Sequence, residues 1–442
     1  MKLPCYPRYV TSRDPWVGSV PAHWKMLRAD FTTASNKEQI SDTAMEGIEV
    51  LHYSIPNVQE FGTAQVEDGN DIDSSKLQIN TAQLLISKLN PRKATLCIAE
   101  PDKKLLTVCS GEFVPIIPEG ELTLRYCYYT WLSDKVTKML SSRVQSVTRS
   151  HQRVSPEDIT RLPWAWPPAD EQKHIAAFLD WKTGQIDALI ARKKELLEKL
   201  KEKRIAVITQ AVTQGLNPAA PMRDSGIPWL GQVPQHWKVP ALKFRYNVEL
   251  GKMLDEKRIT GEHPVSYLRN VDVQWDKINY EDLPVMDITQ DEYPRYTIKE
   301  NDVLVCEGGE VGRSAVARAQ EDVIGFQKAI HRLRAEVGDE LPKFIYYTLL
   351  WAVNTGVFSV EGASTIAHLT ADQLRRYRFP RPPRSEQVEI VANLDERVGQ
   401  IKKMIKKVES AIDRLTEYRT ALVTAATTGK IDVRNIKVST QG

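Results

Sequence analysis

The chain of 442 residues lacks several features that would define a class of protein at once. None of its cysteines form a Cys-x-x-Cys pair, which disfavours both a disulfide framework and a four-thiolate zinc site. Reduced cysteines are typical of the cytoplasm. No run approaches the roughly 18 apolar residues that a membrane helix needs, and no secretory leader is visible. We therefore expect a cytoplasmic protein that does not enter a membrane.

Catalytic motifs are also missing. There is no Gly-x4-Gly-Lys-Ser/Thr phosphate loop and no Asn/Asp-Pro-Pro-aromatic motif of an amino-methyltransferase. The glycines of 308–312 lack the following helix and acidic residue of a dinucleotide site, so we interpret them as a tight turn. His23 and His236 have no Asp or Cys partner at a useful spacing, which favours a packing and hydrogen-bonding role. The sequence thus predicts a chain that is not an enzyme and holds no cofactor or metal.

A large excess of one charge is absent too. Sixty Lys and Arg stand against 57 Asp and Glu, a net charge of +3, which argues against a histone-like polyanion binder but permits local basic surfaces. With 42% hydrophobic residues, each half of the chain can bury a core, and the length predicts about two to four domains.

The sequence contains one long internal repeat. An opening motif, Pro-Trp-x-Gly-x-Val-Pro-x-His-Trp, occupies 15–24 and recurs at 228–237. A helix-start motif, Pro-Pro-x-x-Glu-Gln, occupies 167–172 and recurs at 382–387. The two spacings are nearly equal, so a unit of about 215 residues is used twice.

Each unit should consist of a globular body followed by a long helix. Apolar residues after each helix-start motif alternate at spacings of three and four, which predicts a helical seam of about 40 residues, or roughly 60 Å. Two such stripes should pack on each other, although separate docking on each body is an alternative. The seam residues that we single out, also as a partner-binding surface, are Ile186, Leu200, Ile401, Ile405 and Leu415. Arg419 interrupts this pattern, and we expect it to face partner subunits.

The bodies read as mixed α/β. Short β-like runs are predicted at 84–87, 95–98, 114–117, 302–306, 314–317 and 329–333, with helices near 121–140 and 340–351. The predicted fold class is α+β, with two bodies joined and spaced by two long helices. The predicted segments are a first body at 1–166, a central helix at 167–217, a second body at 218–381, a C-terminal helix at 382–430 and a polar tail at 431–442.

Basic and amide side chains gather ahead of each long helix and in nearby loops. Such residues suit phosphate contacts and base-edge readout, and the alternative for any single one of them is an ordinary solvated surface. The candidate DNA-binding residues are Lys88, Arg92, Arg143, Arg149, Arg153, Arg269, Asn270, Arg313, Lys328, Arg332, Arg375 and Arg376.

The doubled motifs resemble those of one known family, the DNA specificity subunits of type I restriction-modification systems. The likeness rests on both opening motifs, both helix-start motifs, the run 302–305 with the turn 308–313, and the repeat period. It covers nearly the whole chain.

The resemblance implies a non-catalytic host-defence protein in which each body reads one half of a bipartite, asymmetric site in double-stranded DNA. The two bodies would be target-recognition domains in a pseudo-twofold arrangement. The two long helices would form an antiparallel coiled coil that fixes the half-site spacing and binds two methyltransferase subunits, through which nuclease-translocase subunits join. S-adenosylmethionine, ATP and Mg²⁺ would belong to those partners.

Two other classes remain open at this point. One is a tandem DNA-binding scaffold or repressor-like protein that never meets a methyltransferase. The other is a single-chain methyltransferase or nuclease with unfamiliar motifs, against which the missing motifs speak.

Overall fold

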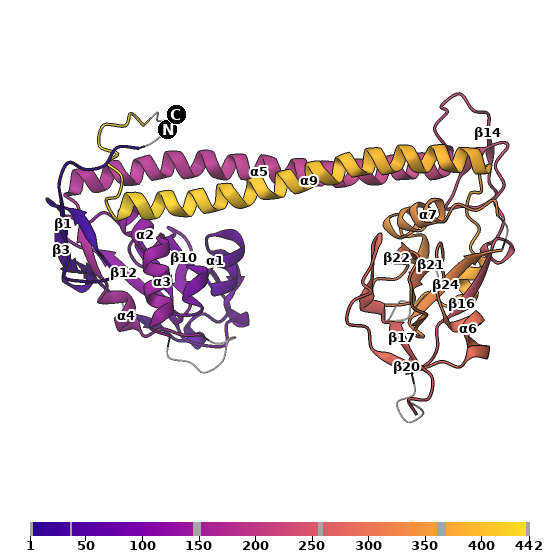
Figure 1. The fold of residues 1–442 in the computed structure, drawn as a ribbon. Helices are drawn as coiled ribbons and strands as arrows, with labels where there is room; N and C mark the ends of the chain where they lie inside the picture. The colour runs from indigo at the N-terminus through magenta and orange to yellow at the C-terminus, as the bar shows by residue number, and fades with distance from the viewer. Residues whose placement is uncertain are drawn as a thin grey trace. The chain divides into compact units, whose positions relative to one another are not determined.

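The structure, a computed structural model, describes residues 3–35, 38–144, 152–254, 260–336, 338–359 and 368–438. These residues form two compact units. Unit 1 comprises Met1–Lys194 together with Ser410–Gly442, and unit 2 comprises Glu195–Glu409. Each unit combines helices with β-sheets, so the predicted α+β class is confirmed (Figure 1).

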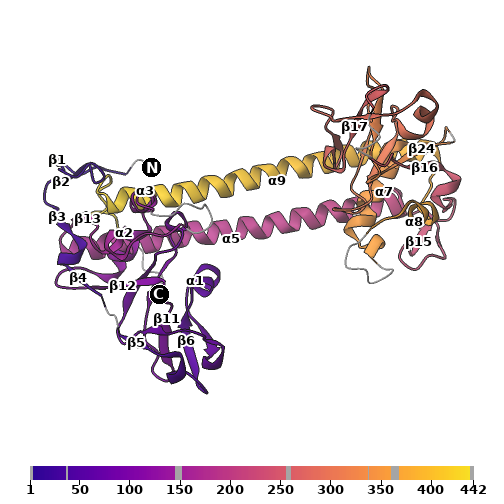
Figure 2. The same cartoon turned by 90° about the horizontal axis from the view of Figure 1, so that it is seen from below.

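Two long helices dominate the secondary structure. Helix α5 covers Ala169–Gln214 and helix α9 covers Arg384–Thr427. In unit 1 the start of α5 shares a buried cluster with the end of α9, and in unit 2 the end of α5 shares one with the start of α9. The two helices therefore pack antiparallel within each unit, as the views in Figures 1 and 2 also show.

Unit 1 holds the first body. Its short helices are α1 (Ile55–Phe61), α2 (Leu124–Leu132), α3 (Asp134–Ser142) and α4 (Pro156–Thr160). Its strands are β1 (Tyr9–Thr11), β2 (Ser19–Pro21), β3 (Lys25–Arg28), β4 (Thr33–Ala34), β5 (Gln39–Ile40), β6 (Glu49–Tyr53), β7 (Gln65–Asp68), β8 (Lys76–Gln78), β9 (Gln83–Ser87), β10 (Leu96–Ala99), β11 (Leu106–Cys109), β12 (Phe113–Pro118) and β13 (Pro163–Trp166).

Unit 2 holds the second body. Its short helices are α6 (Tyr293–Tyr296), α7 (Pro342–Asn354) and α8 (Ala371–Arg376). Its strands are β14 (Met222–Asp224), β15 (Gln232–Pro234), β16 (Tyr246–Leu250), β17 (Pro264–Leu268), β18 (Val273–Gln274), β19 (Lys277–Ile278), β20 (Val285–Asp287), β21 (Val303–Cys306), β22 (Ser314–Val316), β23 (Ile324–Phe326) and β24 (Ile330–Ala335).

The two bodies share one topology although their sequences differ. Unit 1 has an antiparallel sheet in the order β10-β9-β12-β4, and unit 2 has the matching order β22-β21-β24-β16. A second sheet in each unit is built around a parallel pair, β6 with β11 in unit 1 and β17 with β23 in unit 2. The internal repeat thus extends through the bodies as a fold.

Each predicted β-run overlaps a strand and extends at most one residue beyond it; the strands are β9, β10, β12, β21, β22 and β24. The single helix expected near 121–140 is instead two helices, because Ser133 is extended and its hydroxyl accepts a hydrogen bond from the backbone N–H of Val136, capping α3. The segment predicted as a polar tail also differs from expectation. Val433 is completely buried in the core of unit 1, and the backbone N–H of Asp432 donates to the carbonyl oxygen of Pro4.

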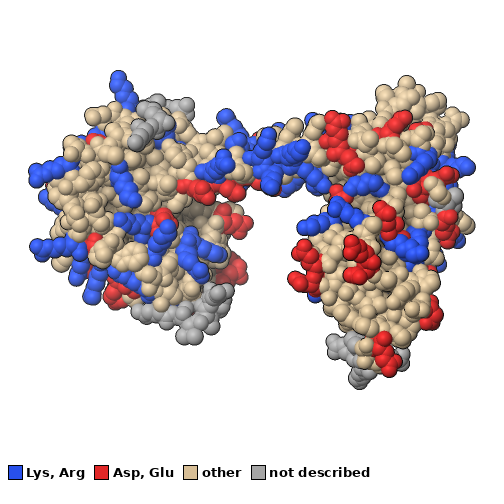
Figure 3. Space-filling view, in the orientation of Figure 1, with Lys and Arg blue, Asp and Glu red and all other residues tan. Residues whose placement is uncertain are grey.

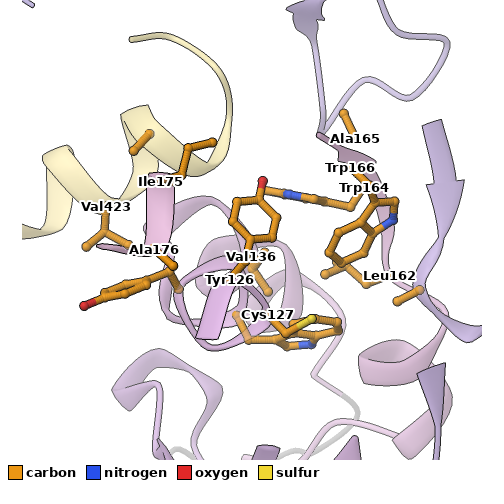
Figure 4. Close-up of a cluster of buried hydrophobic side chains, with 14 of the residues drawn as sticks. Tyr126, Cys127, Val136, Leu162, Trp164, Ala165, Trp166, Ile175, Ala176 and Val423 are labelled. Atoms are coloured by element: carbon orange, nitrogen blue, oxygen red, sulfur yellow. The ribbon is translucent and has the colours of Figure 1, made fainter. Parts of the chain in front are cut away.

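The core of unit 1 lies where its body meets the long helices. Figure 4 shows this cluster around Tyr126, with Trp164 and Trp166 from β13, Ile175 from α5 and Val423 from α9. Helices from distant parts of the chain thereby hold one face of the body in place, which leaves its remaining surfaces to carry function.

Candidate nucleic-acid interface

The two repeated motifs meet at a buried carboxylate in unit 1. Glu171, in the first turn of α5, accepts hydrogen bonds from the Tyr6 hydroxyl at 2.6 Å and the Trp24 indole N–H at 3.0 Å. Its second oxygen lies 2.7 Å from Nε2 of His23. Acidic side chains are favoured at a helix N-terminus, and here the carboxylate also ties the opening motif to the helix.

The same arrangement recurs in unit 2. Glu386, in the first turn of α9, accepts a hydrogen bond from the Trp237 indole N–H at 2.9 Å, and its other oxygen lies 2.6 Å from Nε2 of His236. The hydrogen-bonding role predicted for both histidines is therefore confirmed. This doubled Trp–His–Glu contact is called the frame node below.

Two further pairs repeat the attachment of body to helix. The side-chain oxygens of Gln172 and Gln387 accept from the backbone N–H groups of Thr123 at 3.0 Å and Leu341 at 2.8 Å. The hydroxyls of two tyrosines donate to carboxylates that lie further along the two long helices. These pairs are Tyr129 with Asp180 and Tyr347 with Asp395, each at 2.6 Å. Both bodies are thus positioned on their helices by the same set of contacts.

A glycine follows each long helix and lies beside the tryptophan of one opening motif. Gly215 follows α5 with φ +76°, and an added Cβ would lie 3.1 Å from the ring of Trp237. Gly429 follows α9 with φ +69°, and its Cβ would clash with Pro21 and approach Trp24. Each opening motif therefore contacts the start of one long helix and the glycine that ends the other.

The predicted seam residues lie in or beside the helix contact. Ile186, Leu200 and Ile401 are buried, while Ile405 and Leu415 are partly buried. Two other leucines of the predicted stripe, Leu189 and Leu196, are instead exposed, which corrects that part of the pattern. The guanidinium of Arg419 binds the carboxylate of Asp187 on the opposite helix at 2.8 Å, which corrects the expectation that this side chain turns away from the seam. Whether the seam also binds a partner stays a prediction.

In unit 1 some of the candidate DNA-binding residues lie at the surface, and others form ion pairs with acidic side chains. Arg92 is exposed in the β9–β10 loop, and Lys88 lines a hollow of about 410 Å³ together with Asp30 and Glu157. Arg153 donates to Glu112 at 2.6 Å, and Arg143 reaches Asp158 at 3.5 Å. Arg149 lies outside the described residues.

In unit 2 two of the candidates brace a turn. The Asn270 amide donates to the carbonyl oxygens of Gly308 and Ala329, and its side-chain oxygen accepts from Arg313 at 2.7 Å. Arg313 also donates to the Asn270 backbone and contacts the sulfur of Cys306. These bonds hold the β21–β22 loop, which is the predicted tight turn, so the two side chains support a surface from within.

Arg332 is a correction. We predicted it to bind DNA, but it lies on the central strand β24 and is only 1% exposed. Its guanidinium donates to the carbonyl oxygens of Pro294, Arg295 and Thr297. Burial lowers its pKa to about 10, and the charge of Arg334 acts in the same direction. These bonds tie strand β24 to the segment that contains α6.

The remaining candidates of unit 2 are at the surface. Lys328 and Arg376 are exposed, whereas Arg375 donates to Asp372 and to the backbone of Val248. Arg269 pairs with Asp272 at 2.9 Å. Within each unit, the lysines and arginines that no acidic side chain holds are the ones best able to reach a phosphate.

Sequence reasoning missed two surfaces. Phe31 and Phe244 match in the repeat and are 69% and 66% exposed, each with a cation over its ring, Arg28 and Lys243 respectively. A row of lysines on α9 was also overlooked. The repeat alignment contains a signal for both surfaces. It shows that the phenylalanine is kept in both copies, whereas the lysines of α9 have no lysine at the equivalent positions of α5.

Within the described part of the chain, no helix is long and apolar enough to cross a membrane. The same residues contain no group of three or more His, Cys, Asp or Glu placed to hold a metal ion.

Comparison with known proteins gives consistent results. Residues 244–410 match the family model of the type I restriction modification DNA specificity domain. The EcoBI type I restriction enzyme specificity subunit of Escherichia coli is 25% identical over 353 residues, covering 76% of this chain and 71% of that protein. The StySPI specificity subunit of Salmonella potsdam is 21% identical over 371 residues, covering 78% and 76%.

Two solved structures share the fold at 16% sequence identity. A chain from a study of complex assembly and conformational transition of the type I R-M system has a TM-score of 0.73, covering 92% of this chain and 98% of that one. The HsdS subunit from Thermoanaerobacter tengcongensis has a TM-score of 0.56, covering 93% and 98%.

Proposed function

The chain belongs to the family of DNA specificity subunits of type I restriction-modification systems, and we propose that it reads a bipartite, asymmetric site in double-stranded DNA while docking two methyltransferase subunits. Nuclease-translocase subunits would join through those methyltransferases. In this proposal the chain itself is non-catalytic and cytoplasmic, and S-adenosylmethionine, ATP and Mg²⁺ are used by the partners.

One observation carries the proposal: the frame is the same twice, whereas the surfaces it presents are different. The frame node, with Glu171 in unit 1 and Glu386 in unit 2, keeps its residue types and contacts. The loops after the equivalent strands β9 and β21 do not, because 88–93 is basic and 307–312 carries two glutamates. Two bodies of one topology but different surface chemistry suit the reading of two different half-sites.

Exposed residues at equivalent positions of the repeat support a partner protein of which two copies bind, one on each unit. Phe31 and Phe244 each end a short 3-10 helix and leave about two thirds of the ring in solvent. An exposed aromatic ring at one position is unremarkable, but the same ring at the same position of both units suits two copies of one protein.

The long helices carry a second matched feature. Gly184 and Gly399 occupy equivalent positions inside α5 and α9, where a helical glycine costs about 1 kcal/mol relative to alanine. An added Cβ at either would meet nothing within 4 Å, so packing inside the chain does not require glycine there. Five residues later, Leu189 and Met404 also match and are exposed. Both features favour close approach of an external protein to each helix.

The proposal is tested by co-expression with the methyltransferase encoded beside this chain. We expect a purified complex of one chain with two methyltransferases, by mass, and methylated adenines confined to one bipartite asymmetric sequence. A chain that purifies alone and leaves no methylation pattern would favour the scaffold or repressor-like alternative. Methyl transfer or cleavage by the isolated chain would favour the single-chain enzyme instead.

Substitutions of the matched phenylalanines test the docking. Phe31→Ala and Phe244→Ala should each lower the affinity of one methyltransferase by about 10- to 100-fold, giving complexes with a single methyltransferase, and the double variant should retain neither. Phe61→Ala is the control, because Phe61 is similarly exposed but has no match in the opening repeat. Two methyltransferases on the double variant would exclude these side chains from the interface.

A further inference from the structure

One face of α9 in unit 2 carries a compact row of lysines. Lys402, Lys403, Lys406 and Lys407 stand at i, i+1, i+4 and i+5, and all four are exposed. At 3.6 residues per turn these positions lie on one side of the helix over about two turns. This set is called the lysine face below. Figure 3 shows that Lys and Arg side chains gather over the long helices.

The lysine face is poorly neutralised by the chain itself. Among the described residues its one ion pair joins Lys402 to Asp276, at 3.8 Å, and that carboxylate also binds Lys343. Like charges four residues apart on a helix repel each other, so the arrangement is mildly destabilising by itself. The chain tolerates this cost at four neighbouring positions.

Other lysines of the long helices are treated differently. Lys199 and Lys201, on α5 in the same unit, each bind a glutamate of their own helix, at 2.6 Å to Glu195 and 2.8 Å to Glu198. These two lysines are neutralised by their own helix, whereas Lys403, Lys406 and Lys407 form no ion pair among the described residues. The lysine face is therefore a dense cluster of unpaired positive charge, which suits an external partner of negative charge.

The repeat shows what kind of partner this is. The positions in α5 that match the lysine face are Asp187, Ala188, Ala191 and Arg192, so the first copy carries no such face. A protein that docks on both units in the same way needs equivalent surfaces on both. An occupant that is bound once, such as a single DNA duplex, does not.

We propose that the lysine face binds the phosphate backbone of the DNA duplex and adds affinity without adding sequence information. The inference rests on the proposed DNA-binding function. Lysine ammonium groups act as point charges on phosphates and have no fixed geometry for base recognition, in contrast to the forked guanidinium of arginine. The contact is therefore electrostatic, sequence-independent and sensitive to salt.

The test uses the complex with both methyltransferases and a fourfold variant, Lys402→Gln, Lys403→Gln, Lys406→Gln and Lys407→Gln. Glutamine keeps helix propensity close to that of lysine at exposed sites. DNA affinity is measured against salt concentration, for a duplex containing the mapped site and for an unrelated duplex of equal length. We expect the slope of log K against log [salt] to become shallower by up to about 3.6, at roughly 0.9 per lost phosphate contact.

Affinity for the two duplexes should fall by the same factor, and the methylated sequence should stay the same. The control is Lys199→Gln with Lys201→Gln, which removes two paired lysines from the same unit and should leave the slope unchanged. An unchanged slope in the fourfold variant, or a loss confined to the specific duplex, would overturn the inference while the proposed function stands.

Two other outcomes are informative. Loss of a methyltransferase from the fourfold variant, with an unchanged salt slope, would identify the occupant as an acidic protein surface and overturn the inference. A wild-type complex that binds no DNA would overturn both the inference and the proposed function. Helicity of the fourfold variant by circular dichroism separates either result from misfolding.

Discussion

Replacing Glu171 by alanine removes the acceptor on which the frame node of unit 1 depends. Two of its donors, the Tyr6 hydroxyl and the Trp24 indole N–H, belong to buried side chains, whereas His23 is exposed enough to bond water instead. A buried donor left without its partner costs about 1–3 kcal/mol. We therefore expect Glu171→Ala to lower the free energy of unfolding of unit 1 by about 3–5 kcal/mol.

The equivalent change in unit 2 should cost less. Glu386 is 35% exposed and holds one buried donor, Trp237, beside the exposed His236. For Glu386→Ala we expect a loss of about 1–2 kcal/mol, confined to unit 2. The two variants change the same residue type in the same motif, so their difference reports the number of buried donors.

The assay is native-state hydrogen exchange with peptides assigned to each unit, which gives an opening free energy for each separately. Asp170→Ala is the control, because this carboxylate is in the same helical turn but 99% exposed, and its loss should cost only about 0.3–1 kcal/mol through the helix dipole. The reasoning is refuted if Glu386→Ala costs as much as Glu171→Ala, or if the control matches Glu171→Ala.

The remaining predictions concern helix ends and pH. Alanine should destabilise most at Gly429, where the Cβ clashes, less at Gly215, and least at Gly226, which has positive φ but open space; equal unfolding midpoints in urea would contradict this order. Burial by itself raises the pKa of Glu340, but the hydrogen bonds and charge of Arg245 outweigh it and hold the pKa below its ordinary value. Because the pKa of Glu340 is lower in the folded state than in the unfolded state, its carboxylate stabilises unit 2 fully above about pH 4.5. This stabilisation is lost as the pH falls further. The stability difference between wild type and Glu340→Gln should therefore shrink below that pH in acid unfolding experiments, and a constant difference would contradict it.

The sequence predicted most of the helices and strands, because the spacing of apolar and turn residues that marks each of them lies within a short segment. Runs such as 84–87 and 302–306 are apolar and bounded by turn residues, and they form β9 and β21. The spacing of three and four in α9 likewise predicted a helix with a buried stripe. The exposure of Leu189 was missed, since the same spacing cannot separate a buried seam from a second apolar row on the outer side.

The candidate site was harder to predict because it depends on contacts between distant residues. Arg332 and Arg334 alternate with Leu333 and Ala335 as solvent-facing strand residues would. However, β24 is a central strand, and backbone carbonyls some 35 residues away surround the Arg332 guanidinium. The amide of Asn270 meets Arg313 across 43 residues. A single sequence shows the residue types that could bind DNA but not which of them the fold uses internally.

The division of the chain into units has a consequence for its synthesis. Unit 2 is a continuous stretch, so all of its residues have been synthesised before the last part of unit 1 is made. Unit 1 needs 410–438 for its core, including Val433, and for the glycine that closes α9. Although domains usually fold in the order of synthesis, here the first body keeps an open hydrophobic face until 410–438 have been made, and a nonsense mutation near residue 410 would damage the first body while sparing the second.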